Sequence, residues 1–117
     1  MKEDILKSKS YDFALRIVKM YRYLAEEKRE FVLSKQVLRS ATSIGANIEE
    51  AKQAESKSDF VHKLSVANKE AFETHYWLRL LRDSELLSEK QAESLLNDCY
   101  EIQSLLTASI KTAKSRK

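Results

Sequence analysis

The chain contains no proline and a single glycine, Gly45, among its 117 residues. Glycine and proline most often punctuate strands and turns, so a chain that almost lacks them has few places at which it can bend sharply. Long helices joined by short connections suit this composition, and the length fits one hydrophobic core. The sequence therefore predicts an all-α fold in a single domain, 1–117.

Four segments carry apolar or small residues at spacings of three and four, the period of one helix face. Their stripes are, in chain order, Phe13, Ile17, Met20 and Leu24; Val37, Ala41, Ile44, Ile48 and Ala51; Phe60, Leu64, Ala67, Ala71, Thr74, Leu78 and Leu81; and Ala92, Leu95, Cys99, Ile102, Leu106 and Ala113. They predict helices over about 10–27, 35–55, 59–83 and 89–112, followed by a basic C-terminal tail. Because the connections are short, neighbouring helices run antiparallel, and we predict an up-down-up-down four-helix bundle.

Serines mark the expected helix starts. Ser10 and Ser34 are predicted to cap the first two helices, since a serine oxygen accepts a hydrogen bond from an otherwise unpaired backbone N–H. The third helix is expected to begin directly after Ser58. The fourth opens with Ser88 and, three residues later, Gln91, a spacing that predicts a reciprocal capping box.

Nothing in the sequence predicts a membrane span or a secretory signal. No stretch approaches the roughly 18 uninterrupted apolar residues of a membrane helix, and the first residues lack the apolar run of a signal peptide. The lone Cys99 cannot form an internal disulfide, which agrees with a reducing compartment among others. We therefore expect a cytoplasmic protein with no membrane partner.

Motifs of catalysis and metal binding are absent from the sequence. A di-iron bundle needs Glu-x-x-His pairs on two helices, and neither His62 nor His75 follows a glutamate at that spacing. Cys99 lies on a predicted core stripe, where a thiol behaves as a small hydrophobe. There is no glycine-rich phosphate loop and no cysteine pair with zinc spacing. We expect no catalytic residue, no metal site and no cofactor.

Two of the predicted helices are apolar on a second side. At about 100° per residue, these second stripes fall away from the core positions. They comprise Tyr11, Leu15 and Val18 on the first helix and Phe72, Tyr76 and Leu80 on the third. Contiguous stripes rich in aromatic residues are typical of protein interfaces, so we prefer self-association through these residues; edge packing inside a splayed bundle is the alternative.

The second helix carries a polar strip instead. It is formed by Gln36, Ser40, Ser43, Asn47 and Glu50. One interpretation is structural: Ser43 and Asn47 satisfy one another or a backbone carbonyl, and Gly45 lets a neighbouring helix approach. The other interpretation makes the strip the lining of a pocket or channel between subunits.

Positive charge gathers at the two ends of the chain. Residues 1–29 hold eight lysines and arginines against five acidic residues, and residues 104–117 hold four against none. The candidate phosphate contacts are Lys7, Lys9, Arg16, Lys19, Arg22, Lys111, Lys114, Arg116 and Lys117. An anionic partner fits such a distribution, and ordinary solubilising charge is the alternative.

A resemblance to a known family covers nearly the whole chain. It is carried by residues 36–51, QVLRSATSIGANIEEA, by 60–71, FVHKLSVANKEA, and by 73–81, ETHYWLRLL. They resemble a bacterial family labelled four-helix bundle protein, whose first known members are encoded in intervening sequences of large-subunit ribosomal RNA genes. The resemblance implies a ring-shaped homo-oligomer, a pentamer. It also implies kinship with accessory proteins of diversity-generating retroelements, which bind nucleic acid and a reverse transcriptase.

The resemblance carries over a polar motif and shows two departures. The motif positions are Arg39, Ser43, Asn47 and Glu50. Many relatives have glycine in place of Ala51 and proline in place of Gly45, so the geometry of the second helix is expected to differ.

Two functions remain as hypotheses. The first is an oligomer that binds RNA or DNA through basic surface without reading base sequence. The second is a scaffold that binds a partner protein, such as a reverse transcriptase, through the second apolar stripe of the third helix or through the polar strip.

Overall fold

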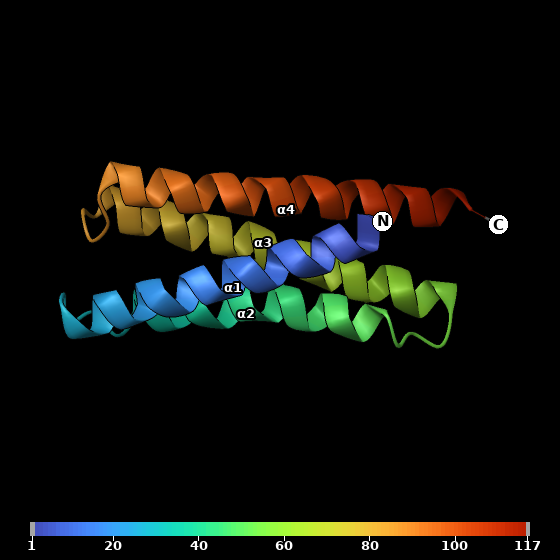
Figure 1. Ribbon diagram of the computed structural model, residues 1–117, viewed down its shortest axis with the longest axis horizontal. Coiled ribbons are helices and arrows are strands. Elements are labelled where there is room, and N and C mark those ends of the chain that lie inside the picture. The colour runs from blue at the N-terminus through green and yellow to red at the C-terminus, as the bar shows by residue number, and fades with distance from the viewer. Residues whose placement is uncertain (1, 117) are drawn as a thin grey trace.

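The computed structural model describes residues 2–116 and forms an antiparallel four-helix bundle (Figure 1). The helices are α1 (Lys2–Glu26), α2 (Leu33–Ala51), α3 (Lys57–Asp83) and α4 (Glu89–Ser115), and no strand occurs within 2–116. The bundle measures 50 × 21 × 19 Å. The predicted all-α, up-down-up-down architecture is confirmed.

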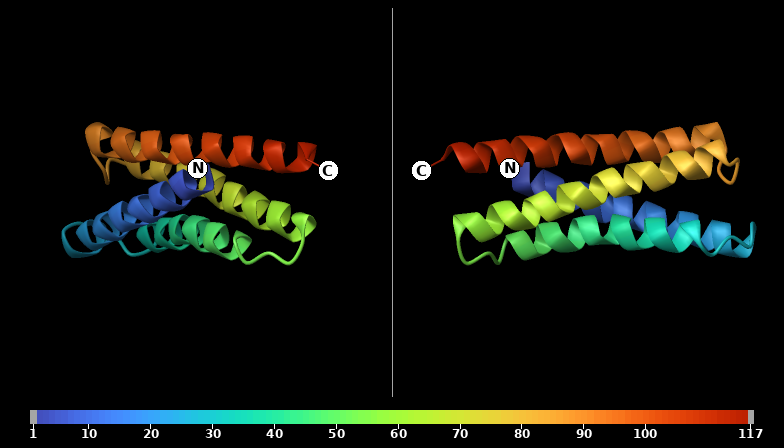
Figure 2. Two further views of the ribbon diagram at one scale, coloured as in Figure 1. Left: turned by 45° about the vertical axis from the view of Figure 1, so that its right-hand side comes forward. Right: turned by 180° about the vertical axis from the view of Figure 1, so that it is seen from behind.

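Among the described residues, each helix packs closely along its two neighbours around the bundle, and the backbones of the diagonal pairs lie farther apart. The contacts run from α1 to α2, α2 to α3, α3 to α4 and back from α4 to α1. Figure 2 shows α1 crossing obliquely, with its N-terminal end near α4 and its C-terminal end beside α2. The outward faces of α1 and α3 therefore point to opposite sides of the bundle.

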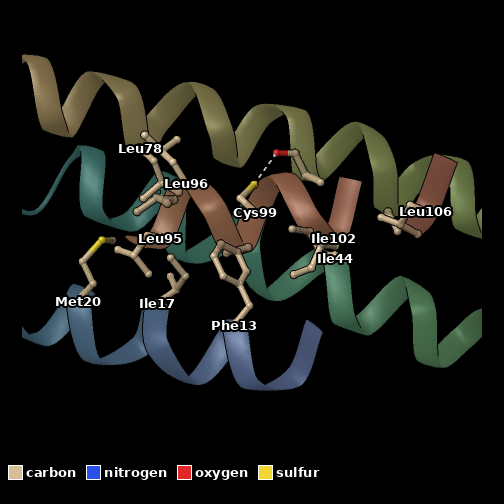
Figure 3. Packing of buried hydrophobic residues seen from close by; sticks show 14 of the residues in the cluster. Phe13, Ile17, Met20, Ile44, Leu78, Leu95, Leu96, Cys99, Ile102 and Leu106 are labelled. Atoms are coloured by element: carbon tan, nitrogen blue, oxygen red, sulfur yellow. Dashed lines mark hydrogen bonds between the residues drawn. The ribbon is translucent and has the colours of Figure 1, made fainter. Parts of the chain in front are cut away.

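One hydrophobic core fills the interior, as Figure 3 shows around Phe13 and Cys99. Every predicted stripe residue is buried except Phe60 and Ala113, which are partly buried. Removal of these side chains from water is the main favourable contribution to folding. Leu6, which the prediction left out, is also buried.

The predicted start of the first helix is wrong. Ser10 does not cap a helix; it is buried in mid-helix, where its hydroxyl donates to the Lys7 carbonyl at 3.0 Å. A serine that bonds back to its own helix in this way is compatible with helix interior. The helix therefore begins at Lys2 and adds Leu6 to the core stripe.

The predicted Ser34 does not cap the second helix: the N-cap residue is Val32, and the Glu30 side chain accepts from the first backbone N–H groups. The Glu30 carboxylate accepts from the backbone N–H groups of Val32, Leu33 and Ser34, at 3.1, 3.0 and 2.8 Å. Burial alone would raise the pKa of Glu30, but these backbone donors lower it below its ordinary value. The preceding residue, Arg29, has φ of 54°, in the left-handed region.

The remaining helix limits differ from the prediction by a few residues. α2 ends at Ala51 instead of 55, and α4 continues to Ser115 instead of 112. The cap of α3 is Ser56, whose hydroxyl accepts from the Asp59 N–H at 3.0 Å. The capping box of Ser88 and Gln91 is confirmed, with both reciprocal hydrogen bonds present.

Gly45 lies where α2 meets α1. A Cβ placed on it would lie 3.6 Å from the Ser10 hydroxyl oxygen and 3.8 Å from the Ser10 carbonyl oxygen. These are ordinary van der Waals distances. The helices therefore lie close together here, but with room for one methyl group.

We expect Gly45→Ala to stabilise the protein by about 0.5–1 kcal/mol, because alanine is the better helix former and its methyl group fits against Ser10. Urea unfolding at fixed protein concentration measures this difference. Gly45→Leu is the control: its larger side chain meets the α1 backbone and should lower stability. A loss of stability in Gly45→Ala would contradict the spacing of α1 and α2.

Candidate functional site

The second apolar stripes of α1 and α3 remain uncovered by the rest of the chain. Tyr11 and Leu15 are 63% and 48% exposed, and Phe72 and Tyr76 are 60% and 48% exposed. The other two members, Val18 and Leu80, are half-buried. Packing within the chain therefore does not account for these stripes, and each offers apolar surface to a second molecule.

Tyr76 is held in a defined position on the outer side of α3. Its ring meets the neighbouring Trp77 edge-on, with centroids 5.2 Å apart and planes at 68°. The Arg79 guanidinium carbon lies 5.7 Å from the Tyr76 centroid, within the range of a cation–π contact. The α3 face is thus aromatic with one cation at its edge.

The cations predicted on α1 divide into two groups. Three of them form ion pairs with neighbouring helices: Lys7 with Glu49, Lys9 with Glu101, and Arg16 with Asp98. Lys19 and Arg22 are exposed and form no ion pair among the described residues. The basic surface of α1 is therefore smaller than the sequence suggests and lies toward the C-terminal half of the helix.

The predicted C-terminal tail is mostly the end of α4. Lys111 and Lys114 belong to the helix, where a cation in the last turn interacts favourably with the helix dipole. Arg116 follows the helix, and none of the three forms an ion pair within 2–116. Lys117 lies outside the described residues. Because α1 and α4 run antiparallel, these cations and the Lys19–Arg22 group lie toward opposite ends of the bundle (Figure 1).

The polar motif of α2 is bonded within the chain. The Asn47 side-chain amide donates to the Ser43 carbonyl at 2.8 Å and to its hydroxyl at 3.1 Å. Buried Ser40 pairs with Thr74 of α3 at 2.8 Å. These contacts support the structural interpretation of the strip.

Charged members of the motif join α2 to α3. Arg39 contacts Glu70 at 3.2 Å and also Glu73, whose carboxylate accepts from the Trp77 indole N–H at 2.9 Å. The Trp77 hydrogen bond and then the Arg39 guanidinium lower the pKa of Glu73. The remaining motif residue, Glu50, accepts from the Lys63 ammonium at 2.8 Å. The motif thus forms a polar seam along two packed helices.

A groove between α3 and α4 contains residues that the sequence reasoning missed. It has a volume of about 760 Å³ and is lined by Phe72 of α3 together with Tyr100 and Gln103 of α4. Tyr100 is 67% exposed. Tyr100 lies away from the core stripe of the fourth helix. An aromatic residue in such a position is the same kind of sequence signal that identified the second stripes on the first and third helices.

The acidic, histidine and cysteine side chains of the described residues do not gather into a metal centre. No cluster of three or more His, Cys, Asp or Glu residues suitable for a metal ion occurs there. Burial and the nearby Arg79 and Arg82 lower the pKa of His75. Nor is any of the helices, as described, long and apolar enough to cross a membrane.

The thiol of Cys99 lies in the core. It is fully buried and donates to the Ala71 carbonyl at 3.3 Å, as the dashed line in Figure 3 shows. Burial, with a smaller contribution from Asp98, raises the pKa of Cys99 to about 12. Because the thiolate is the reactive form, this cysteine is inert in the folded protein.

We expect Cys99 in the folded protein to react with a disulfide reagent at least ~100-fold more slowly than in urea, since both access and thiolate are lacking. Absorbance of the released thiol measures the rate. The matched control is Asn97→Cys in a Cys99→Ala background, an exposed site on the same helix, which should react quickly. Rapid reaction of native Cys99 would contradict its burial.

The order and pairwise packing of the helices define the class: an antiparallel four-helix bundle protein. The family model described as 23S rRNA-intervening sequence protein matches residues 2–108, and the chain belongs to this family. A crystal structure from Bacteroides thetaiotaomicron, described as a protein with unknown function from the S23 ribosomal protein family, is 55% identical. The match covers 95% of this chain and 99% of that one, with a TM-score of 0.94. No curated protein matches the chain.

Proposed function

We propose that the protein is a non-enzymatic homo-oligomer that binds RNA or DNA in the cytoplasm, through phosphate groups and with tolerance of sequence. The observation that carries this proposal is a set of exposed cations that form no ion pair within the described chain. They are Lys19, Arg22, Lys111, Lys114 and Arg116. Such cations are available to replace counterions on a phosphate backbone.

Self-association would increase the basic surface. The exposed stripes of α1 and α3 differ from one another and point to opposite sides of the bundle. A contact between two different faces is head-to-tail, and repeated head-to-tail contacts close into a ring when the rotation permits. Each added subunit repeats the cations at both ends of the bundle. A pentamer is the ring that the resemblance to relatives favours.

A protein-interaction scaffold is the second candidate. Phe72 and Tyr76 form an exposed aromatic face, and aromatic residues are enriched at protein interfaces. A partner protein, such as a reverse transcriptase, would occupy the same kind of surface as a second subunit. The net charge of +3 is small, which leaves room for this alternative to nucleic-acid binding.

We expect sedimentation to detect an assembly several times heavier than the 13.6 kDa chain. Tyr76→Asp should dissociate it into folded monomers, because a charge would lie unpaired in an apolar contact. Phe31→Asp is the control, since Phe31 has a similar exposure, 45%, but lies in the loop between α1 and α2. A wild-type monomer at all concentrations, or an unchanged assembly in Tyr76→Asp, would contradict the proposed interface.

Binding to nucleic acid should weaken steeply with salt. The logarithm of the binding constant is expected to fall linearly with that of salt concentration, at about −0.9 per phosphate on duplex DNA and about −0.7 on single strands. A variant without the C-terminal cations should show a flatter slope. It combines Lys111→Ala, Lys114→Ala, Arg116→Ala and Lys117→Ala. Titration of structured RNA and duplex DNA at two salt concentrations measures the slope.

The control for this variant removes the same amount of charge elsewhere. It combines Lys28→Ala, Lys35→Ala, Lys69→Ala and Lys90→Ala, all exposed positions. Equal slopes in both quadruple variants would show that only net charge matters and would reject the C-terminal surface. Absence of wild-type binding near physiological salt would reject the nucleic-acid function and leave the scaffold.

A further inference from the structure

The groove between α3 and α4 has aromatic walls and open volume. Phe72 of α3 and Tyr100 of α4 line it and are 60% and 67% exposed. The space of about 760 Å³ falls within the range of sites for small organic ligands. Exposed aromatic rings on both sides of a groove offer flat faces on which a planar group can stack.

The groove contains an amide without a partner in the chain. Gln103 is only 7% exposed, lines the groove, and has no side-chain hydrogen bond within the described residues. Its amide atoms keep some contact with solvent, so water or a ligand in the groove can bond to them. The amide presents a donor and an acceptor side by side, the pattern that fits a base edge.

A second unsatisfied amide lies along the same pair of helices. The Asn68 side-chain oxygen is buried and has no hydrogen-bond partner. Its nitrogen lies 3.5 Å from the hydroxyl of Thr107, which lines the groove. The α3–α4 seam therefore contains one buried amide oxygen without a partner, on Asn68, and the unbonded amide of Gln103 at the groove.

The charge of the groove is positive. Its lining includes Arg79 and Lys111 and no acidic side chain. Neither cation forms an ion pair among the described residues, although Arg79 also lies over the Tyr76 ring. Burial and the nearby Arg79 and Arg82 lower the pKa of His75, which also lines the groove.

The two cations lie at opposite ends of the groove. Thr107 is level with Asn68, and Glu93 is level with Arg82, as the contacts between these pairs show. At 1.5 Å per residue, the stretch of α4 between these two levels is roughly 20 Å long. Arg79 lies one helical turn from Arg82, and Lys111 lies one turn from Thr107. The two positive charges therefore flank the rings of Phe72 and Tyr100 and the Gln103 amide.

We propose that this groove binds single-stranded nucleic acid, with bases stacked on Tyr100 and Phe72, a base edge bonded to the Gln103 amide, and flanking phosphates held by Arg79 and Lys111. The inference rests on the proposed nucleic-acid function and adds base contacts to the phosphate contacts. It assigns Phe72 to the groove, so the α3 side chains left for the subunit contact are Tyr76 and Leu80. Stacking accepts every base, so sequence tolerance is kept. A duplex, whose bases are already stacked and paired, cannot use these contacts.

The test compares single-stranded and duplex RNA of equal length on the full-length assembly, by fluorescence anisotropy. The single-stranded probes are oligouridylate and oligoadenylate. Tyr100→Ala should weaken single-strand binding about 5- to 100-fold and leave duplex binding unchanged, while Tyr100→Phe keeps the ring and should bind as wild type. Gln103→Leu, which removes the amide at similar volume, should weaken single-strand binding and reduce any difference between the two probes.

Phe31→Ala provides the matched control, because it removes an exposed ring far from the groove and should change neither affinity. If wild type binds both RNAs but Tyr100→Ala binds single strands equally well, the groove proposal fails and the phosphate proposal stands. If wild type binds neither RNA, both proposals fail. If Tyr100→Ala dissociates the assembly in sedimentation, the groove belongs to a subunit or protein contact, which overturns the base-binding site.

Discussion

The burial of one apolar stripe from each of four long helices is the constraint on which this structure depends. With no proline and one glycine, the chain turns only at its three connections. Each apolar stripe is therefore buried along its length against two antiparallel neighbouring helices. The resulting core contains the only cysteine, and no group of side chains suited to a metal ion occurs among the described residues. The aromatic side chains that the helices leave exposed lie on their outer faces, at Tyr11, Phe72, Tyr76 and Tyr100.

The periodic stripes predicted the fold and core well, whereas the helix starts were partly wrong for a physical reason. The spacing of apolar residues can be read directly from the sequence, but the cap of a helix depends on which oxygen reaches the free backbone N–H groups at its start. Glu30 reaches them from outside the helix, directly after Arg29 in a left-handed conformation, and no spacing rule reveals either feature. Ser10 and Ser34 use their hydroxyls on carbonyls of the preceding turn instead.

The outer surface was harder to predict than the core because charge pairing spans distant parts of the sequence. Lys9 and Arg16 look like unpaired cations when only residues near them in the sequence are considered, yet their acidic partners lie more than 80 residues later, on α4. Each pair is exposed and contributes little stability, but it removes a cation from the surface open to phosphates. Tyr100 was missed for a different reason. It is a single aromatic residue away from the core stripe of its helix, and it forms part of an aromatic surface only because the fold places it in the same groove as Phe72.

The two long seams of α3 differ in how completely the chain satisfies its own polar groups. Toward α2, Arg39 pairs with Glu70 and Glu73, and Ser40 pairs with Thr74, so polar side chains of the two helices bond to one another across this seam. Toward α4, the buried Asn68 oxygen has no partner, and the Gln103 amide is unbonded beside exposed rings. Polar groups without partners favour a ligand or water over a bare surface, and this asymmetry is the reason for which the proposed base contacts lie at α3–α4 and not at the polar motif of α2.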